Sequence, residues 1–376
     1  MNKKILFIPI LFTTFLITTG CWDQYLMKDA RLVLVAGFDT TPGGDILDSV
    51  VMPVIGPTGG TGSMQSEEVQ VVSAVGHSPR DARLKIDKQT AKKFDASKMH
   101  SLLLSSDFAK EDIFPSLDIF YRDPKSSLRA NLVVVDGQAL EVLQLKVEEK
   151  QRIGQYLSDI LESAKYNTII DIHMIQSICP IMFDPGQDFV LPLIEVVDNR
   201  VDVKGLALFH GEKYTGESLT TIESKLFNLM QDKKHGAARF SFPLTNDDEK
   251  RNENVITFDI EDVKSKFNVT IDKSGKVSAN IKMDLDVQIL EYPKDQLNKK
   301  STIKKLNKQL TQIMNEASNE LLEKVQKANS DVFGVGRNVI AYHKKDWEKM
   351  DWEKEYPTID FQSDVQVKII QHGIIN

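Results

Sequence analysis

The segment 277–289 constrains the fold of this chain more than any other part of the sequence. Its seven odd-numbered positions are all apolar, and the six even-numbered positions between them are all polar. Side chains alternate between the two faces of a β-strand, so this pattern predicts a strand with one dry and one wet face. Such strands are typical of an antiparallel sheet that is covered on one side only.

The neighbouring segments predict the rest of this sheet. Residues 263–271 alternate in the same way, and Asp272–Gly275 provides a turn that joins the two strands. The segment 294–329 carries apolar residues at a spacing near 3.6, which indicates a long straight helix. A last alternating strand follows at 365–369. We therefore predict an antiparallel sheet packed by a long helix in the C-terminal region.

The first half of the chain alternates between β-rich and helical segments. Three β-rich runs cover 31–38, 45–54 and 67–76, and further strands are predicted at 100–104 and 132–135. Helices are predicted from Ser78 to about residue 97, near 107–114 and over 139–166, with Ser78 as the N-cap of the first. This alternation predicts an N-terminal α+β domain built around a mixed sheet.

The length of 376 residues, 41% of them apolar, allows two or three domains with separate cores. The predicted fold class is α+β and multi-domain. We expect an N-terminal domain over 21–198 and a C-terminal α+β region over 199–376. A further division of that region near residue 250 is left open.

Residues 1–20 have the features of an export signal. Two lysines are followed by an apolar stretch, Ile5–Ile17, which as a helix rises only about 20 Å and is too short to span a membrane. Small residues then precede Cys21, as in the bacterial lipobox, although Thr18 stands where leucine is usual. We expect Cys21 to be lipidated and to begin the mature chain. The alternative is an ordinary secretory signal that ends by chance near a cysteine.

Composition excludes several other classes of protein. The chain has 47 basic and 54 acidic residues, which disfavours binding of nucleic acid by charge. Two cysteines exclude a disulfide framework and a cysteine-rich zinc module. The glycine-rich segment 56–63 lacks the Gly-Lys-Ser/Thr ending of a phosphate-binding loop, so we interpret it as a connection between strands.

Residues with the spacing of a catalytic or metal site are missing from the sequence. The seven histidines are never three or four residues apart, and no HExxH, GxSxG or CxxC motif occurs. We therefore predict no enzymatic activity, no metal and no cofactor. Trp347 and Trp352 stand among charged residues and have two interpretations: a platform for a partner, or a cover for the end of the long helix.

Several segments together resemble one protein family. They are CWD (21–23), RLVLVAGFD (31–39), PRDARLKIDKQTAKKF (79–94), MHSLLL (99–104), FYRDPKSSLRANLVVVDGQALEVL (120–143), VKGLALFHGEKYTGE (203–217), KANSDVFGVG (327–336) and KKDWEKMDWEKEYP (344–357). Their order and spacing are similar to those of the Ger(x)C family, the lipoprotein C subunits of nutrient germinant receptors in endospore-forming bacteria.

The resemblance implies a function. A C subunit of this family is acylated at its lipobox cysteine, here Cys21, and lies on the outer face of the spore's inner membrane. It assembles with two integral-membrane partners, an A subunit and a B subunit, and has no attributed enzymatic activity. The family has an α+β fold of about three domains.

Two other classes of function are weighed against this one. A lipoprotein that delivers a solute to a transporter normally has two similar lobes around a cleft, whereas the two halves of this chain differ. A hydrolase would need a nucleophile paired with a base, and the sequence offers no such pair.

Overall fold

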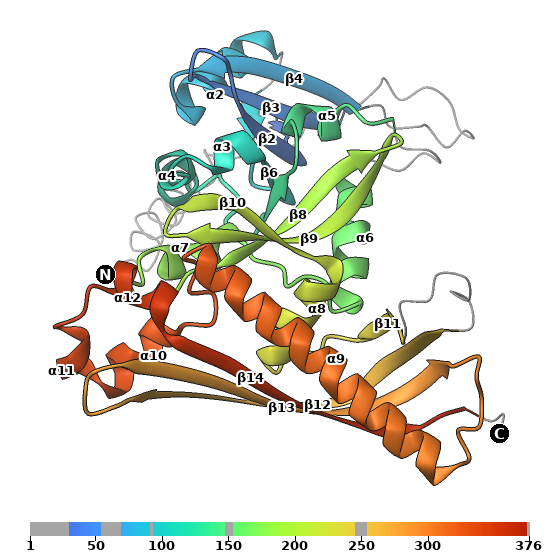
Figure 1. Cartoon of the computed structure of the whole chain (residues 1–376). Helices are drawn as coiled ribbons and strands as arrows, with labels where there is room; N and C mark the ends of the chain where they lie inside the picture. The colour runs from blue at the N-terminus through green and yellow to red at the C-terminus, as the bar shows by residue number, and fades with distance from the viewer. Residues whose placement is uncertain (1–29, 54–68, 91–92, 147–152, 245–253, 374–376) are drawn as a thin grey trace, which may run out of the picture.

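The computed structural model describes residues 30–53, 69–90, 93–146, 153–244 and 254–373. These residues form an eight-stranded sheet, a four-stranded sheet and a small two-stranded sheet (Figure 1). The predicted α+β fold class is confirmed. The signal segment, Cys21 and the glycine-rich segment 56–63 lie outside the described residues.

The eight-stranded sheet is mixed, as predicted for the N-terminal region. Four central strands, β2, β6, β7 and β8, run parallel, and antiparallel strands extend the sheet on both sides. In order across the sheet the strands are β10 (Lys213–Thr220), β9 (Arg200–His210), β8 (Val190–Val197), β7 (Asn131–Val135), β6 (Ser101–Ser105), β2 (Val35–Thr40), β3 (Ile46–Pro53) and β4 (Val69–Gly76). Two short strands, β1 (Ala30–Leu32) and β5 (Lys93–Asp95), pair in parallel beside it.

Helices cover both faces of this sheet, which explains why its central strands are continuous apolar runs. Side chains of α5 (Ala139–Leu143), α6 (Ile153–Tyr166) and α8 (Thr221–Met230) share one apolar cluster with one face. Side chains of α2 (Pro79–Gln89), α3 (Ser106–Ala109), α4 (Phe114–Arg122) and α7 (Ile175–Met182) pack on the other.

Ser78 is the N-cap of α2, as predicted, and accepts a hydrogen bond from Asp81 N at 3.2 Å. The prediction that this helix reaches residue 97 is wrong. It ends at Gln89, because Lys93–Asp95 forms a strand that pairs with β1.

The sheet continues across the predicted boundary at 198/199. Asp198 and Asn199 have φ angles of 48° and 64°, so they form a tight turn that leaves β8 and β9 as antiparallel neighbours. Residue 250 likewise falls between two paired strands, β11 and β12. In the described chain the change from one sheet to the other comes between Thr220 and Arg239.

The four-stranded sheet contains the strands that alternation predicts. Its order is β11 (Arg239–Pro243), β12 (Val255–Ile271), β13 (Val277–Glu291) and β14 (Asp360–Gln371). All seven apolar positions of 277–289 are buried. The turn between β12 and β13 is held by the Asp272 carboxylate, which accepts hydrogen bonds from the backbone N–H groups of Ser274 and Lys276.

One detail of the predicted C-terminal sheet is wrong. β14 pairs with β13 in the parallel direction, so the sheet is not wholly antiparallel. The reason is the long helix α9 (Lys300–Lys327), which follows β13 in the chain and runs back along the sheet (Figure 1). β14 therefore starts from the same end of the sheet as β13 and runs in the same direction. Between α9 and β14 lie α10 (Val335–Tyr342), α11 (Lys344–Trp347), α12 (Trp352–Glu355) and the 3₁₀ turn η3 (Tyr356–Thr358).

Besides its apolar face, α9 has a polar row that bonds to the backbone of β14. Four residues along a helix rise about 6 Å, and two residues along a strand rise about 6.6 Å, so two such rows stay in step. The pairs are Asn307 with Ile369, Thr311 with Val367, Asn315 with Val365 and Asn319 with Ser363. We call this row the α9–β14 seam. It occupies four outward N–H groups of the edge strand and the carbonyl groups of Ser363 and Val365.

Candidate functional site at the junction of the two sheets

The region built on the eight-stranded sheet (residues 30–220) and the region built on the four-stranded sheet (residues 239–373) meet at a polar junction around Asp188 and Asp331. Asp188 lies in the loop between α7 and β8, and Asp331 lies between α9 and α10. The Asp188 N–H donates to the Asp331 carbonyl at 3.0 Å. In return the Asp331 N–H donates to Asp188 Oδ2 at 2.7 Å, and the Gly211 N–H donates to Asp188 Oδ1 at 2.7 Å. One carboxylate thus joins three chain segments.

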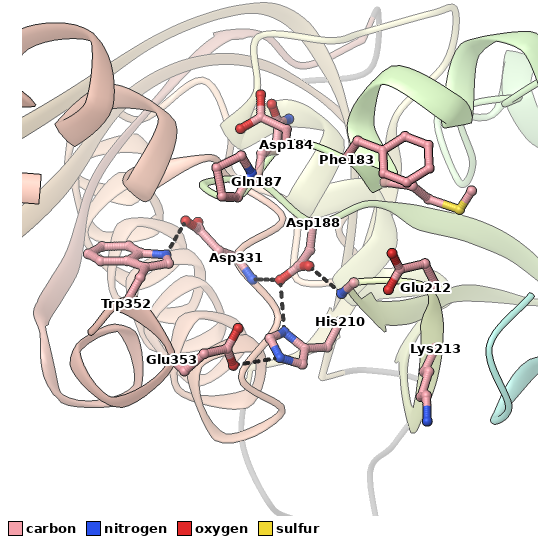
Figure 2. Close-up of a pocket in the computed structure, with 13 residues that line it drawn as sticks. Phe183, Asp184, Gln187, Asp188, His210, Glu212, Lys213, Asp331, Trp352 and Glu353 are labelled. Atoms are coloured by element: carbon pink, nitrogen blue, oxygen red, sulfur yellow. Dashed lines mark hydrogen bonds and ion pairs between the residues drawn. The ribbon is translucent and has the colours of Figure 1, made fainter. Parts of the chain in front are cut away.

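The Asp331 carboxyl group caps the start of α10. Its two oxygens accept hydrogen bonds from Val335 N and Gly336 N, each at 2.8 Å, and Trp352 Nε1 donates to Oδ2 at 3.3 Å (Figure 2). The residue is only 3% exposed. Burial raises the pKa of Asp331 to about 7, while the backbone hydrogen bonds act in the opposite direction. Its ionisation therefore falls near neutral pH.

His210, at the end of β9, contacts Asp188 of its own region through one ring nitrogen and Glu353 of the other region through the other. Nδ1 lies 3.3 Å from Asp188 Oδ2, and Nε2 lies 2.8 Å from Glu353 Oε2 (Figure 2). The hydrogen bond with Asp188, supported by the Glu353 carboxylate and opposed by burial, raises the pKa of His210 to about 9. The imidazole is therefore a cation held between two carboxylates at neutral pH.

Two glycines allow the segments on either side of this junction to touch. A Cβ atom on Gly336 would lie 2.7 Å from the Trp352 ring and 2.9 Å from Gly186 Cα. The Arg337 N–H donates to the Gly186 carbonyl at 2.7 Å, and the Arg337 side chain pairs with Asp184. The close approach requires both positions to lack a side chain.

A cavity of about 520 Å³ lies beside these groups. Its lining residues are Met182, Phe183, Asp184, Pro185, Gln187, Asp188, His210, Gly211, Glu212, Lys213, Asp331, Trp352 and Glu353. The lining contains five carboxylates and no serine, threonine or cysteine. Within the described ranges, no three histidine, cysteine or acidic residues are grouped so as to hold a metal. These groups form a charged interface between the two regions.

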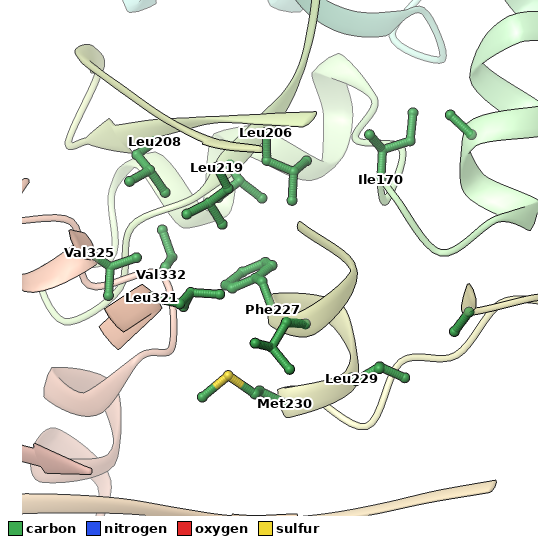
Figure 3. Packing of buried hydrophobic residues seen from close by; sticks show 14 of the residues in the cluster. Ile170, Leu206, Leu208, Leu219, Phe227, Leu229, Met230, Leu321, Val325 and Val332 are labelled. Carbon is green, nitrogen blue, oxygen red and sulfur yellow. The ribbon is translucent and has the colours of Figure 1, made fainter. Parts of the chain in front are cut away.

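An apolar cluster continues the junction between the sheets. Figure 3 shows side chains of β9 and β10, of α8 and of α9 packed together, with Phe227 of α8 in the middle. Glu223 of α8 adds an ion pair with Lys324 of α9 at 2.9 Å. The two regions are therefore joined by both apolar and polar contacts.

Among the residues singled out in the sequence, Cys21 lies outside the described part of the chain. Trp347 and Trp352 lie together, with ring centroids 5.5 Å apart, and Trp352 packs against Tyr356 and the junction. Trp352 therefore lies against the residues that directly follow the long helix, which favours the interpretation of the two tryptophans as a cover for the end of that helix.

Sequence reasoning missed Asp188, His210 and Asp331 as junction residues. His210, Asp331 and Glu353 lie in three separate segments that carry the family resemblance, and their sequence positions give no sign that they meet. The signal in the sequence was that these three distant segments all belong to the set that resembles the family.

Two family models match the chain. One, described as "Spore germination protein N-terminal domain", matches residues 23–196, and the other, "Spore germination B3/ GerAC like, C-terminal", matches residues 204–373. The fold and the matches define the class as spore germination proteins. More specifically, the chain belongs to the Ger(x)C family. The two models meet at the β8–β9 turn, although the sheet continues across it.

Individual relatives agree with this assignment. Spore germination protein GerQC of Bacillus cereus is 23% identical over 100% of this chain and 99% of its own length. Putative spore germination protein YfkR of Bacillus subtilis is 22% identical over 53% of this chain and 54% of its own length. The crystal structure of the GerBC protein has the same fold, with a TM-score of 0.53 and 16% identity, over 89% of this chain and 96% of that one.

No helix within the described residues is both long and apolar enough to cross a membrane.

Proposed function

We propose that this chain is the lipid-anchored C subunit of a nutrient germinant receptor and that it acts without catalysing a reaction. The observation that carries the proposal is the match to spore germination proteins, which extends from residue 23 to residue 373 apart from a short gap. In this proposal the chain assembles with integral-membrane A and B subunits on the outer face of the spore's inner membrane.

The proposed anchor is a diacylglyceryl group on Cys21. The cysteine follows an apolar stretch and small residues, as in a lipobox, with Thr18 at the position where leucine is usual. A single acyl chain binds membranes only marginally, whereas a diacylglyceryl group provides the two chains needed for stable attachment. The folded region would then act by contact with membrane partners.

The test compares the two cysteines of the chain in spores that lack other nutrient receptors. We expect Cys21→Ala to release the chain from the membrane and to abolish nutrient-triggered germination, while nutrient-independent germination is unchanged. Cys179→Ala, in α7, is the matched control and should retain the nutrient response. Mass spectrometry of the native chain should find the lipid on Cys21. An unmodified Cys21, or an unchanged response in Cys21→Ala spores, would contradict the proposal.

A second candidate function is a solute-binding module that presents a small ligand to a transporter. The cavity of about 520 Å³ at the junction is the observation that favours it, since pockets of this size accommodate small molecules. Isothermal calorimetry of the purified chain against amino acids and sugars distinguishes the two candidates. Micromolar binding by the chain alone would favour the module.

A further inference from the structure

The outer edge of β12 differs from the outer edge of β14. β11 pairs only with residues 255–259 of β12, so on the side away from β13 the remainder of β12 has no neighbouring strand among the described residues. β14, in contrast, has the outward N–H groups of Ser363, Val365, Val367 and Ile369 bonded along the α9–β14 seam. An unpaired strand edge is a template for another strand.

The direction of the backbone groups in β12 follows from two hydrogen bonds. The Asp272 N–H donates to the Lys276 carbonyl, so even-numbered residues at this end of β12 face β13. The Ser265 N–H instead faces outward and donates to the Asp232 side chain at 3.3 Å. Odd-numbered residues beyond Ser265 therefore direct their N–H and C=O groups away from the sheet.

Three residues leave these outward groups available: Phe267, Val269 and Ile271. Within the described part of the chain, their backbone N–H and C=O groups have no hydrogen-bond partner on this side. We call residues 267–271 the open edge. It is long enough to pair with an extended segment of about five residues.

The side chains at the open edge specify which segment would fit. The side chains of Phe267, Val269 and Ile271 are half-buried on the face that packs against the apolar cluster, so an added strand needs apolar residues on that face. On the other face, Lys264 and Lys266 are exposed. An added strand would continue this row with its alternate residues.

The cross-strand register makes an acidic residue favourable beside Lys266. Lys266 stands opposite Lys282 of β13, and Lys282 stands opposite Asp364 of β14. Like charges directly opposite each other are unfavourable, so a carboxylate on the free side of Lys266 would offset this repulsion. A second copy of β12 would instead bring two more lysines to this row.

We propose that the open edge of β12 is a docking site for an extended segment of a partner protein in which apolar and acidic residues alternate. The segment adds to the sheet as a fifth strand, bonded to the backbone of Phe267, Val269 and Ile271, with a carboxylate beside Lys266. This inference goes beyond the proposed function, because it depends neither on the lipid anchor nor on germinant sensing.

The experiment uses the purified full-length chain and a synthetic peptide of alternating valine and glutamate residues. We expect calorimetry to detect binding, and hydrogen exchange to show new protection of the amides of Phe267, Val269 and Ile271. The Val365 and Val367 amides, already bonded in the α9–β14 seam, should be protected with and without peptide.

Three variants locate the binding. Val269→Pro removes one outward N–H and should weaken binding. Lys266→Glu should weaken binding of the valine–glutamate peptide about tenfold. A peptide of alternating valine and lysine should bind this variant with the affinity that the substitution removed. Lys368→Glu, on the exposed face of β14, is the matched control and should bind normally.

Two results would overturn the proposal. One is no binding, or binding that is equal in the Lys266→Glu and Lys368→Glu variants. The other is concentration-dependent dimerisation through the open edge, which would assign it to a second copy of the chain. Because Lys266→Glu alters an exposed side chain only, the conclusion does not depend on whether Val269→Pro folds.

Discussion

Asp331 combines the roles of a helix cap and a link between two regions. Its carboxyl oxygens hold two backbone N–H groups of α10 and the Trp352 indole, while its own backbone pairs with Asp188. Nearly all of this is buried, so water cannot replace a lost acceptor. A buried donor without a partner destabilises a protein by about 1–3 kcal/mol.

We therefore predict that Asp331→Ala lowers the free energy of unfolding by about 1–3 kcal/mol for each backbone donor left unpaired. Asp331→Asn should lose less stability, since its amide oxygen can still accept one of these hydrogen bonds. Urea unfolding followed by tryptophan fluorescence and by circular dichroism provides the comparison. Asp346→Ala, half-exposed in α11, is the control and should change little. Equal stability of Asp331→Ala and the control would show that the cap is unimportant.

At the scale of elements, the α9–β14 seam joins a helix to a strand edge by side-chain to backbone bonds. Asn315 illustrates the pairing: its amide nitrogen donates to the Val365 carbonyl at 2.7 Å, and its amide oxygen accepts from the Val365 N–H at 2.8 Å. The asparagine amide thus occupies the place of a peptide group in a neighbouring strand. The seam both positions α9 and protects the edge from other chains.

Asn315→Ala is predicted to remove both bonds and to lower the free energy of unfolding by about 1–2 kcal/mol, because water partly replaces them at this half-buried position. The exposed Val365 backbone should also increase self-association, which analytical ultracentrifugation measures. Lys308→Ala, on the solvent side of the same helix, is the matched control. A similar loss in both variants would mean that the seam contributes no specific stability.

At the scale of the whole molecule, the polar junction and the apolar cluster together hold the two sheets. The cluster between α8, α9 and β9 is insensitive to pH. The junction is not, because His210 is positioned between Asp188 and Glu353, which come from different regions. The protonation of one imidazole therefore affects how firmly the two regions are joined.

The expected pH dependence follows from the pKa of His210. An unfolded histidine titrates near 6.5, whereas the folded His210 has a pKa of about 9, so the folded state holds an extra proton between these values. This contribution to stability is complete below pH 6.5 and is lost as the pH rises through 9. Urea unfolding over pH 6–10 should therefore show a fall in stability that His210→Gln reduces.

His77→Gln is the control for this prediction, since His77 is exposed and follows β4, at the edge of the eight-stranded sheet opposite β9 and β10. It should keep the pH dependence of the unmodified chain. If His210→Gln and the unmodified chain lose the same stability between pH 6.5 and 9, another group is responsible.

Local patterns were sufficient to predict many elements. The strand over 277–289, its hairpin with β12, the N-cap at Ser78 and the existence of the long helix all follow from the spacing of apolar residues and from turn chemistry. The antiparallel direction predicted for β14 is wrong, because the direction depends on where the long helix returns the chain and not on the strand's own residues.

The sequence by itself determined the fold class, the faces of the strands and helices, and the family, because each of these is written in short-range periodicity or in ordered segments. Only the tertiary structure decided that β9 and β10 extend the first sheet, that β14 runs parallel to β13, and that Asp188, His210 and Asp331 meet. These features depend on contacts between residues far apart in the chain, and such contacts leave no periodic signal in one sequence.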